Sequence, residues 1–262
     1  MRLLNRLHET FDADGARGVL RRTVRFLYRR FVRPLSGTAR PVRYHGVAVD
    51  LVVKRMDARV PAAWVPEDLR DNPLYEAAQM RALAAHVRPG DDVVIVGGGW
   101  GVTTVEAARR AGPTGRVTTF EGAREWVGRV ERAVQLAAPP APVEVVHAVV
   151  GQPRSLFGEA GGARVVPPSA LPPCDVLELD CEGAEAEVLA DLSFRPRAIL
   201  VETHGVFGTP TSHVRGLLHE RGYVVVTDEP AADDATRGWC EANDVRVLSA
   251  VRSETLTPPP AR

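Results

Sequence analysis

Residues 93–105 read VVIVGGGWGVTTV, an apolar run that leads into four glycines among five residues and then a threonine pair. Glycine loses more backbone entropy on ordering than any other residue, and its advantages are a positive φ angle and close approach of the backbone. The apolar run predicts a buried strand, and the residues after the glycines predict the start of a helix. Because open parallel sheets bind ligands at the carboxyl ends of their strands, the segment predicts a ligand-binding loop.

The same alternation of strand and helix continues along most of the chain. Strands are expected over 92–97, 116–121, 143–149, 175–180, 197–203, 222–227 and 244–251, and helices over 102–111, 123–137, 183–192 and 211–221. Strands that alternate with helices of about ten residues predict a mostly parallel α/β sheet covered on both faces. The continuously apolar strands VVIV, DVLEL and AILV fit burial on both faces.

An N-terminal extension over 1–72 is expected before this α/β domain, which we place at 73–252 and which begins with a helix over 73–87. The extension contains GVLRRTVRFLYRRFVRPL over 18–35, which predicts a basic amphipathic helix, and an alternating hairpin pattern around Gly46 over 41–65. The basic helix has two interpretations: an anchor at an anionic membrane surface, or a helix packed on its own domain with solvated arginines. The proline-rich end over 253–262 is expected to be a disordered tail.

Composition narrows the functional classes. The 262 residues are 45% hydrophobic and carry 33 basic and 33 acidic side chains, so no overall charge favours a nucleic-acid partner. Three widely spaced cysteines, Cys174, Cys181 and Cys240, show neither a disulfide framework nor a zinc spacing. Without a signal peptide or a long apolar run, a cytoplasmic location is expected, with peripheral contact at the inner membrane face as a further hypothesis.

The spacing of the glycines indicates which ligand the loop would hold. A dinucleotide fingerprint requires GxGxxG, whereas Gly97, Gly99 and Gly101 form GxGxG and Val102 stands where the fingerprint's third glycine would be. This spacing favours a nucleoside lying against the backbone. An acidic residue at the end of the second strand would then accept the ribose hydroxyls, and Glu121 occupies that position.

Several motifs together resemble a known family. GGGWG, FEGA, LELDCEGAEAEVL and ILVETHG resemble the FkbM-type S-adenosylmethionine-dependent methyltransferases over about residues 75–227. The resemblance implies a class I methyltransferase (Rossmann-like) fold whose seven-stranded sheet ends in an antiparallel strand, and methyl transfer to a hydroxyl oxygen. It also implies a set of cofactor-binding residues: Gly97, Gly98, Gly99, Trp100 and Gly101 in the loop, Glu121 at the ribose and His147 near the adenine.

Two positions in the loop depart from the family pattern or extend it. The family usually has an acidic residue two positions before the first loop glycine, where this chain has Ile95. Asp91, Asp92 or the Tyr75–Glu76 pair are the candidate substitutes. Trp100 is expected either to stack over the cofactor or to fill the start of the helix.

Four titratable side chains are expected at the carboxyl edge of the sheet: Asp180, Glu182, Glu202 and His204. Methyl transfer to an alcohol requires that its proton be removed, and packed carboxylates repel one another unless they are protonated or bridged by a cation. In one arrangement Asp180 and Glu202 bind Mg²⁺, with Glu182 or His204 as the base. In the other no metal is present, Glu182 is a first-turn helix acid and His204 is the base.

Each of these residues also has a simpler interpretation. Glu182 could only cap a helix, Asp180 could only orient backbone amides, and His204 could be a loop histidine whose hydrogen bonds are satisfied. Glu185 and Glu187 are expected to be solvated or paired along their helix.

The leading functional hypothesis is O-methylation of a hydroxyl on a sugar, glycan or related small molecule. A nicotinamide-dependent dehydrogenase is disfavoured by the GxGxG spacing and because Lys54 is the sole lysine, which leaves no Tyr-xxx-Lys pair. The third hypothesis is a non-catalytic nucleoside-binding or membrane-docked partner protein with a methyltransferase-like fold.

Overall fold

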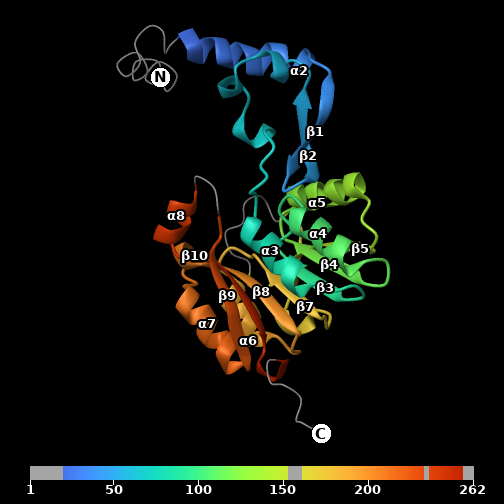
Figure 1. Cartoon of the computed structure of the whole chain (residues 1–262), viewed down its shortest axis with the longest axis vertical. Helices are drawn as coiled ribbons and strands as arrows, with labels where there is room; N and C mark the ends of the chain where they lie inside the picture. The colour runs from blue at the N-terminus through green and yellow to red at the C-terminus, as the bar shows by residue number, and fades with distance from the viewer. Residues whose placement is uncertain (1–19, 153–160, 233–235, 256–262) are drawn as a thin grey trace. The chain divides into compact units, whose positions relative to one another are not determined.

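The structure, a computed structural model, describes residues 20–152, 161–232 and 236–255. The predicted tail therefore lies outside the described residues from position 256 onward, as do the first two residues of the basic segment. The chain divides into two compact units, residues 1–42 with 51–71 and residues 43–50 with 72–262 (Figure 1). The described parts of each are treated separately below.

The larger unit is built on an eight-stranded sheet in the order β6-β5-β4-β3-β7-β8-β10-β9. The strands are β3 (Asp92–Val96), β4 (Arg116–Glu121), β5 (Val143–Val150), β6 (Arg164–Val166), β7 (Val176–Leu179), β8 (Ala198–His204), β9 (Tyr223–Pro230) and β10 (Val245–Arg252). Strands β3 to β8 pair in parallel, and β10 pairs antiparallel to both β8 and β9. The class I methyltransferase fold is confirmed, with the seven expected strands and the short edge strand β6 as an eighth.

Helices cover both faces of this sheet. They are α3 (Ala77–His86), α4 (Val102–Ala111), α5 (Arg124–Ala137), α6 (Glu185–Asp191), α7 (Thr211–Glu220) and α8 (Arg237–Ala242). Glu202 of β8 accepts a hydrogen bond from Gln79 of α3, whereas the hydroxyl of the next residue, Thr203, is hydrogen-bonded to that of Thr211 on α7. Because successive strand residues point to opposite faces, α3 and α7 cover opposite sides of the sheet.

The core lies between these layers. It is formed by aliphatic side chains of the central strands, including Val94, Leu177, Leu179, Ile199 and Val201, each at most 2% exposed. Their burial fits the continuously apolar strands in the sequence and brings the carboxyl ends of β3, β4, β7 and β8 to one edge. That edge carries the glycine loop and the acidic residues.

Two helix starts differ from expectation. Helix α3 begins at Ala77 rather than at residue 73, because Glu76 adopts a left-handed backbone conformation with φ of 49°. Helix α6 begins at Glu185 rather than at residue 183, because Glu182 (φ 54°) and Gly183 (φ 98°) both have positive φ angles. Glu76 and Glu182 both line the cavity described below.

The smaller unit contains the basic helix and most of a hairpin. Residues 20–27 are α-helical and continue into a π-helical turn, η1 (Tyr28–Val32), and α2 (Arg33–Leu35). The expected hairpin consists of β1 (Thr38–Tyr44) and β2 (Val47–Lys54), and its turn residues His45 and Gly46 both have positive φ angles. None of the helices in the described ranges has the length and hydropathy of a membrane span.

Candidate active site at the carboxyl edge of the sheet

The glycine loop connects β3 to α4 and passes very close to the strand beside it. Gly97 has a φ of 101°, and a Cβ atom there would lie 1.8 Å from the backbone oxygen of Asp180. A Cβ on Gly98 would lie 2.6 Å from Cγ2 of Val130. The loop therefore needs glycine both for its backbone conformation and for space. A simple strand-to-helix turn would not require glycine at so many positions.

Glu121 holds this loop in place from the end of β4. Its Oε2 atom accepts hydrogen bonds from the backbone N–H groups of Gly98 (2.9 Å) and Gly99 (3.2 Å), and its Oε1 atom accepts one from Ala123 (2.8 Å). An ionised carboxylate has about four acceptor positions, so one remains for a further donor. Glu121 thus organises the loop and keeps capacity for the predicted ribose contact.

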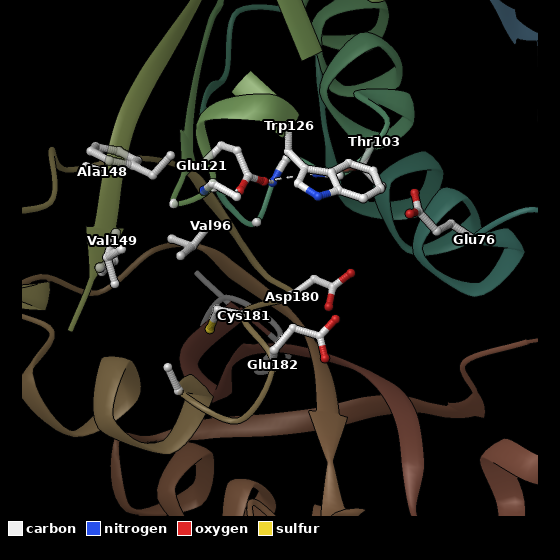
Figure 2. Close-up of a pocket in the computed structure, with 18 of the residues that line it drawn as sticks. Glu76, Val96, Thr103, Glu121, Trp126, Ala148, Val149, Asp180, Cys181 and Glu182 are labelled. Atoms are coloured by element: carbon white, nitrogen blue, oxygen red, sulfur yellow. Dashed lines mark hydrogen bonds between the residues drawn. The ribbon is translucent and has the colours of Figure 1, made fainter. Parts of the chain in front are cut away.

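A cavity of about 340 Å³ opens beside the loop, within the size range of small-molecule sites. The lining includes Gly97, Gly98, Gly99, Glu121, Asp180 and Glu182, whereas the predicted rim residues Glu202 and His204 do not line it. Tyr75, Glu76, Thr103, Trp126 and Gln152 also line it. Figure 2 shows the carboxyl groups of Asp180 and Glu182 side by side, with Glu76 facing the same space from the start of α3.

The charges around this cavity have one sign. Among the described residues that line it, the charged side chains are Glu76, Glu121, Asp180 and Glu182, and no lysine or arginine is present. A cavity of this kind favours a cation and disfavours the pyrophosphate of a dinucleotide.

Three predicted cofactor residues, Trp100, Gly101 and His147, do not line the cavity. Trp100 packs edge-on against Trp126 and Tyr44 and lies under the guanidinium of Arg129, so it fills the start of the helix. Gly101 is required for packing, since a Cβ atom there would lie 2.9 Å from Ala133 Cβ on α5.

His147 occupies β5, where successive side chains point to opposite faces. Its neighbours Ala148, Val149 and Val150 line the cavity instead. The buried Nε2 atom of His147 has no hydrogen-bond partner in the structure. Its predicted contact with an adenine stays a prediction.

Of the acids considered in place of the one missing at Ile95, Glu76 lines the cavity, and Asp91 and Asp92 do not. Asp91 is held by Arg197 and the backbone N–H of Arg88, and Asp92 begins β3, at the opposite edge of the sheet from the loop. Neither can reach the cavity. Glu76 can, because its carboxylate oxygen would lie 3.9 Å from a Cβ atom on Gly99.

A further acid, Glu178, lies beside Ile95 on the neighbouring strand, but it does not line the cavity. Glu178 of β7 is the register partner of Ile95, is 2% exposed, and has an Oε2 atom without a hydrogen-bond partner. Burial raises the pKa of Glu178 well above its usual value, and the charges of Asp180 and Glu76 raise it further. The sequence analysis did not single out Glu178, although a glutamate inside the apolar strand DVLEL was a usable signal.

Burial also raises the pKa of Glu76, to about 8, with a further contribution from the charge of Asp180. A group with this pKa is largely protonated at neutral pH in the free protein. A cation beside it would favour its ionised form. Glu76 is thus suited to respond to a positively charged ligand.

His204 lies at the centre of the acidic rim. Its Nδ1 atom is 2.8 Å from Oε1 of Glu185, and its Nε2 atom is 3.6 Å from one oxygen of each of Asp180, Glu182 and Glu202. Burial lowers the pKa of His204, but the hydrogen bond to Glu185 and the surrounding carboxylates outweigh this effect and raise it to about 9. The imidazolium form then offsets part of the negative charge of the rim.

The expectation that Glu185 is solvated or pairs along its helix was wrong. Glu185 is 0% exposed, and its Oε1 atom contacts His204 and accepts hydrogen bonds from the backbone N–H groups of Cys181 and Gly183. A buried carboxylate requires such partners. Glu187, whose Oε1 accepts the Gln152 backbone N–H, also makes a tertiary contact.

Glu182 was also not the first-turn helix acid that one hypothesis assumed, since α6 begins three residues later. Its side chain is 28% exposed and lies at the cavity. Burial raises the pKa of Glu182 to about 7, and the charge of Asp180 contributes to the shift. Burial likewise raises the pKa values of Asp180 and Glu202.

The rim has the donor set of a metal site. One ligand atom from each of Asp180, Glu182 and His204 lies within 4.8 Å of the others. Glu202 adds an oxygen 3.6 Å from the same His204 nitrogen. Glu185 binds the other ring nitrogen, as carboxylates commonly do behind metal-bound histidines.

Comparison with known proteins shows a similarity over one part of the chain. The family model for the methyltransferase FkbM domain matches residues 163–225, which include Asp180, Glu182, Glu202 and His204. Over these residues the chain is similar to the FkbM methyltransferase domain. The resemblance inferred from the sequence motifs is thereby confirmed. None of the curated proteins is similar enough to this chain to count as a match.

Solved structures of methyltransferases resemble the larger unit of this chain more distantly. Fibrillarin from Aeropyrum pernix, with natively bound S-adenosyl-L-methionine, is 18% identical with a TM-score of 0.42, and the match covers 66% of this chain and 74% of fibrillarin. A SAM-dependent O-methyltransferase from Thermotoga maritima is 15% identical with a TM-score of 0.44, covering 68% and 66%. Precorrin-6y C5,15-methyltransferase from Geobacter metallireducens is 15% identical with a TM-score of 0.46, covering 72% and 94%.

Proposed function

We propose that this protein transfers the methyl group of S-adenosylmethionine to a hydroxyl oxygen of a sugar, glycan or related small molecule. The observation that carries the proposal is the cavity beside the GxGxG loop, lined by four carboxyl groups and, within the described chain, by no basic side chain. S-adenosylmethionine carries a sulfonium and an ammonium group, so it suits this charge. NAD carries a pyrophosphate and does not.

The residues around the cavity fit the parts of this cofactor. The loop glycines leave room for close approach, Glu121 retains an acceptor position for a ribose hydroxyl, and Glu76 is placed for the ammonium group of the methionine part. When bound, the cofactor supplies an electrophilic methyl group on sulfur. Ionisation of Glu76 would accompany binding, because a neighbouring cation lowers the pKa of a carboxyl group.

Glu182 is the proposed general base. It lies at the cavity, is partly exposed and can accept the proton of an acceptor hydroxyl as that oxygen attacks the methyl carbon. Asp180 lines the same cavity, and Glu202 lies beside His204. The protonated His204 ring, held by Glu185, places a positive charge among these carboxylates. This positive charge reduces the repulsion between the carboxylates of the rim.

An aromatic side chain beside the rim supports a sugar acceptor. The Phe207 ring stacks on the His204 imidazole, with centroids 5.8 Å apart, and remains 45% exposed. An exposed ring next to the base offers a flat apolar surface for the C–H face of a sugar. Replacing Phe207 with alanine should raise the acceptor KM while leaving the affinity for S-adenosylmethionine unchanged.

A second arrangement of the same groups is favoured by the convergence of three carboxylates on the His204 Nε2 atom. Here Asp180 and Glu202 hold a divalent cation such as Mg²⁺, joined by Glu182 or His204. Such an ion would polarise the acceptor hydroxyl. Activity that survives EDTA and is not raised by added Mg²⁺ or Mn²⁺ would rule out this arrangement in favour of the metal-free one.

Calorimetry followed by a methyl-transfer assay tests the proposal. The full chain should bind S-adenosylmethionine and not NAD, and should transfer labelled methyl groups to members of a panel of glycosides and phenols. Binding without transfer to any acceptor would favour the non-catalytic nucleoside-binding alternative. Absence of binding to S-adenosylmethionine would refute the proposed function.

A further inference from the structure

One side of the basic helix is committed to contacts within its own unit. Tyr28 is buried, and its hydroxyl donates to Asp57 at 2.6 Å. Arg33 pairs with the same carboxylate at 3.0 Å, and the Arg29 Nε donates to the backbone oxygen of Trp64 at 2.7 Å. These contacts fix the helix on its unit and determine which side chains are left outside.

The remaining large apolar side chains of the helix are exposed. They are Leu20 (64%), Phe26 (60%), Leu27 (46%), Phe31 (56%), Val32 (45%) and Leu35 (90%). Leu27, Phe31 and Leu35 follow one another at intervals of four residues, close to one line along the helix. Monomeric proteins rarely expose apolar side chains at this density without a partner. Within its own unit, this apolar row is therefore left uncovered.

The charge of the same segment is entirely positive. Residues 20–35 contain six arginines and no acidic residue. A hollow beside the helix is lined by Arg25, Arg29 and Arg70, with Glu67 at its margin. Arg70 is anchored, as Arg29 is, through a backbone oxygen, so both guanidinium groups are held in position. Guanidinium groups placed in this way match phosphate oxygens.

We propose that this helix docks the protein on an anionic lipid bilayer, with Leu27, Phe31 and Leu35 in the boundary between headgroups and acyl chains. Exposed arginines beside this row, such as Arg21 and Arg30, then meet the lipid phosphates. A nucleic acid would match the charge but not the apolar row. A second copy would cover the apolar row but bring two sets of six arginines together. A bilayer with anionic lipid satisfies both features.

Vesicle sedimentation with the full chain tests this inference independently of methyl transfer. The protein should pellet with phosphatidylcholine vesicles that contain about one third phosphatidylglycerol, and binding should weaken in 0.5 M salt, since salt screens surface charge. Pure phosphatidylcholine vesicles should bind it much less. Equal binding to both vesicle types, or to neither, would overturn the proposal.

Two double variants separate the charge from the apolar row. Arg21→Glu with Arg30→Glu should lower the partition coefficient by about 30-fold or more, since each basic residue near such a surface contributes about fivefold. Phe31→Ser with Leu35→Ser should also weaken binding, whereas the matched control Arg132→Glu with Leu136→Ser on α5 should not. Circular dichroism and thermal unfolding check that each variant is folded.

Two outcomes would replace the bilayer with another occupant. A concentration-dependent dimer in solution that disappears in the Phe31→Ser, Leu35→Ser variant would indicate a second copy. Binding of a short RNA more tightly than the anionic vesicles, unaffected by the same substitutions, would indicate a nucleic acid. Either result contradicts the membrane inference.

Discussion

The two halves of the site are stabilised in opposite ways. In the loop half, between β3 and β4, the backbone N–H groups of Gly98 and Gly99 are satisfied by Glu121, and atoms pack so closely that glycine is required. In the rim half, at the ends of β7 and β8, three carboxylates crowd around His204 and their pKa values are raised. In the loop half, the backbone conformation is already fixed before a ligand binds. In the rim half, the negative charge is only partly balanced within the protein, and a ligand would balance the rest.

This difference predicts which substitutions alter structure and which alter chemistry. Changes in the loop should impair folding and cofactor binding through steric conflict. Changes in the rim should alter rate and pH dependence and can even stabilise the free protein, because active sites often retain unfavourable charge for function. The following predictions run from the largest expected effect to the smallest.

Gly97→Ala should abolish binding of S-adenosylmethionine and lower the free energy of unfolding by about 3 kcal/mol or more, because its Cβ atom would overlap the backbone oxygen of Asp180. Gly112→Ala is the matched control, since Gly112 also has a positive φ of 67° but has no atom within 4 Å of the added Cβ. It should cost about 1–2 kcal/mol and leave binding unchanged. Denaturant unfolding and calorimetry measure both; equal losses in the two variants would contradict the steric argument.

Glu182→Gln should lower kcat by about 10² to 10⁴, the usual contribution of a general base, while the Kd for S-adenosylmethionine changes little. The control is Glu125→Gln, which removes an exposed carboxylate that pairs with Arg129 on α5. Steady-state kinetics and calorimetry separate the two quantities. A kcat within a few-fold of the unsubstituted enzyme would exclude Glu182 as the base.

Glu76→Gln should remove a pH dependence of cofactor binding. The pKa of Glu76 is raised to about 8 in the free protein, so its neutral form stabilises the fold fully below about pH 4.5, and this stabilisation is lost as the pH rises through 8. A cationic cofactor requires the ionised form, so its affinity should increase by up to about tenfold per pH unit below 8. In the variant, calorimetry between pH 6 and 9 should give a flatter profile and weaker binding at pH 8.5.

Glu185→Gln should lower the pKa of His204, because the hydrogen bond and negative charge of Glu185 are among the causes that raise it to about 9. NMR titration of the His204 ring measures this shift directly, and kcat should fall by about tenfold or less. Glu187→Gln in the same helix is the control. An unchanged His204 pKa in Glu185→Gln would show that Glu185 acts only as packing.

Trp100→Phe should have the smallest effect, a change in cofactor Kd of less than about threefold, since Trp100 does not line the cavity. Its loss of contacts with Trp126 and Arg129 should cost about 1 kcal/mol of stability. Thermal unfolding and calorimetry test this pair of expectations. A large loss of binding would place the indole over the cofactor after all.

Much of this protein was determined by its sequence. The apolar strands and their spacing predicted the sheet and most element bounds, because burial on both faces imposes a readable pattern. GxGxG and the acids after DVLEL and AILV predicted the loop and the rim, since parallel strands bring their carboxyl ends to one edge.

Only the tertiary structure decided how individual side chains are used. Glu185 was expected to be solvated or paired along its helix, and it is buried against His204. Trp100 was expected either to stack over the cofactor or to fill the helix start, and it packs at the helix start. At the cavity, Glu76 from another element supplies an acid where Ile95 does not. The apolar row of the basic helix is exposed because Tyr28, Arg29 and Arg33 hold the opposite side. Periodicity and spacing fix which residues share a face, but contacts between residues distant in sequence fix what each side chain meets.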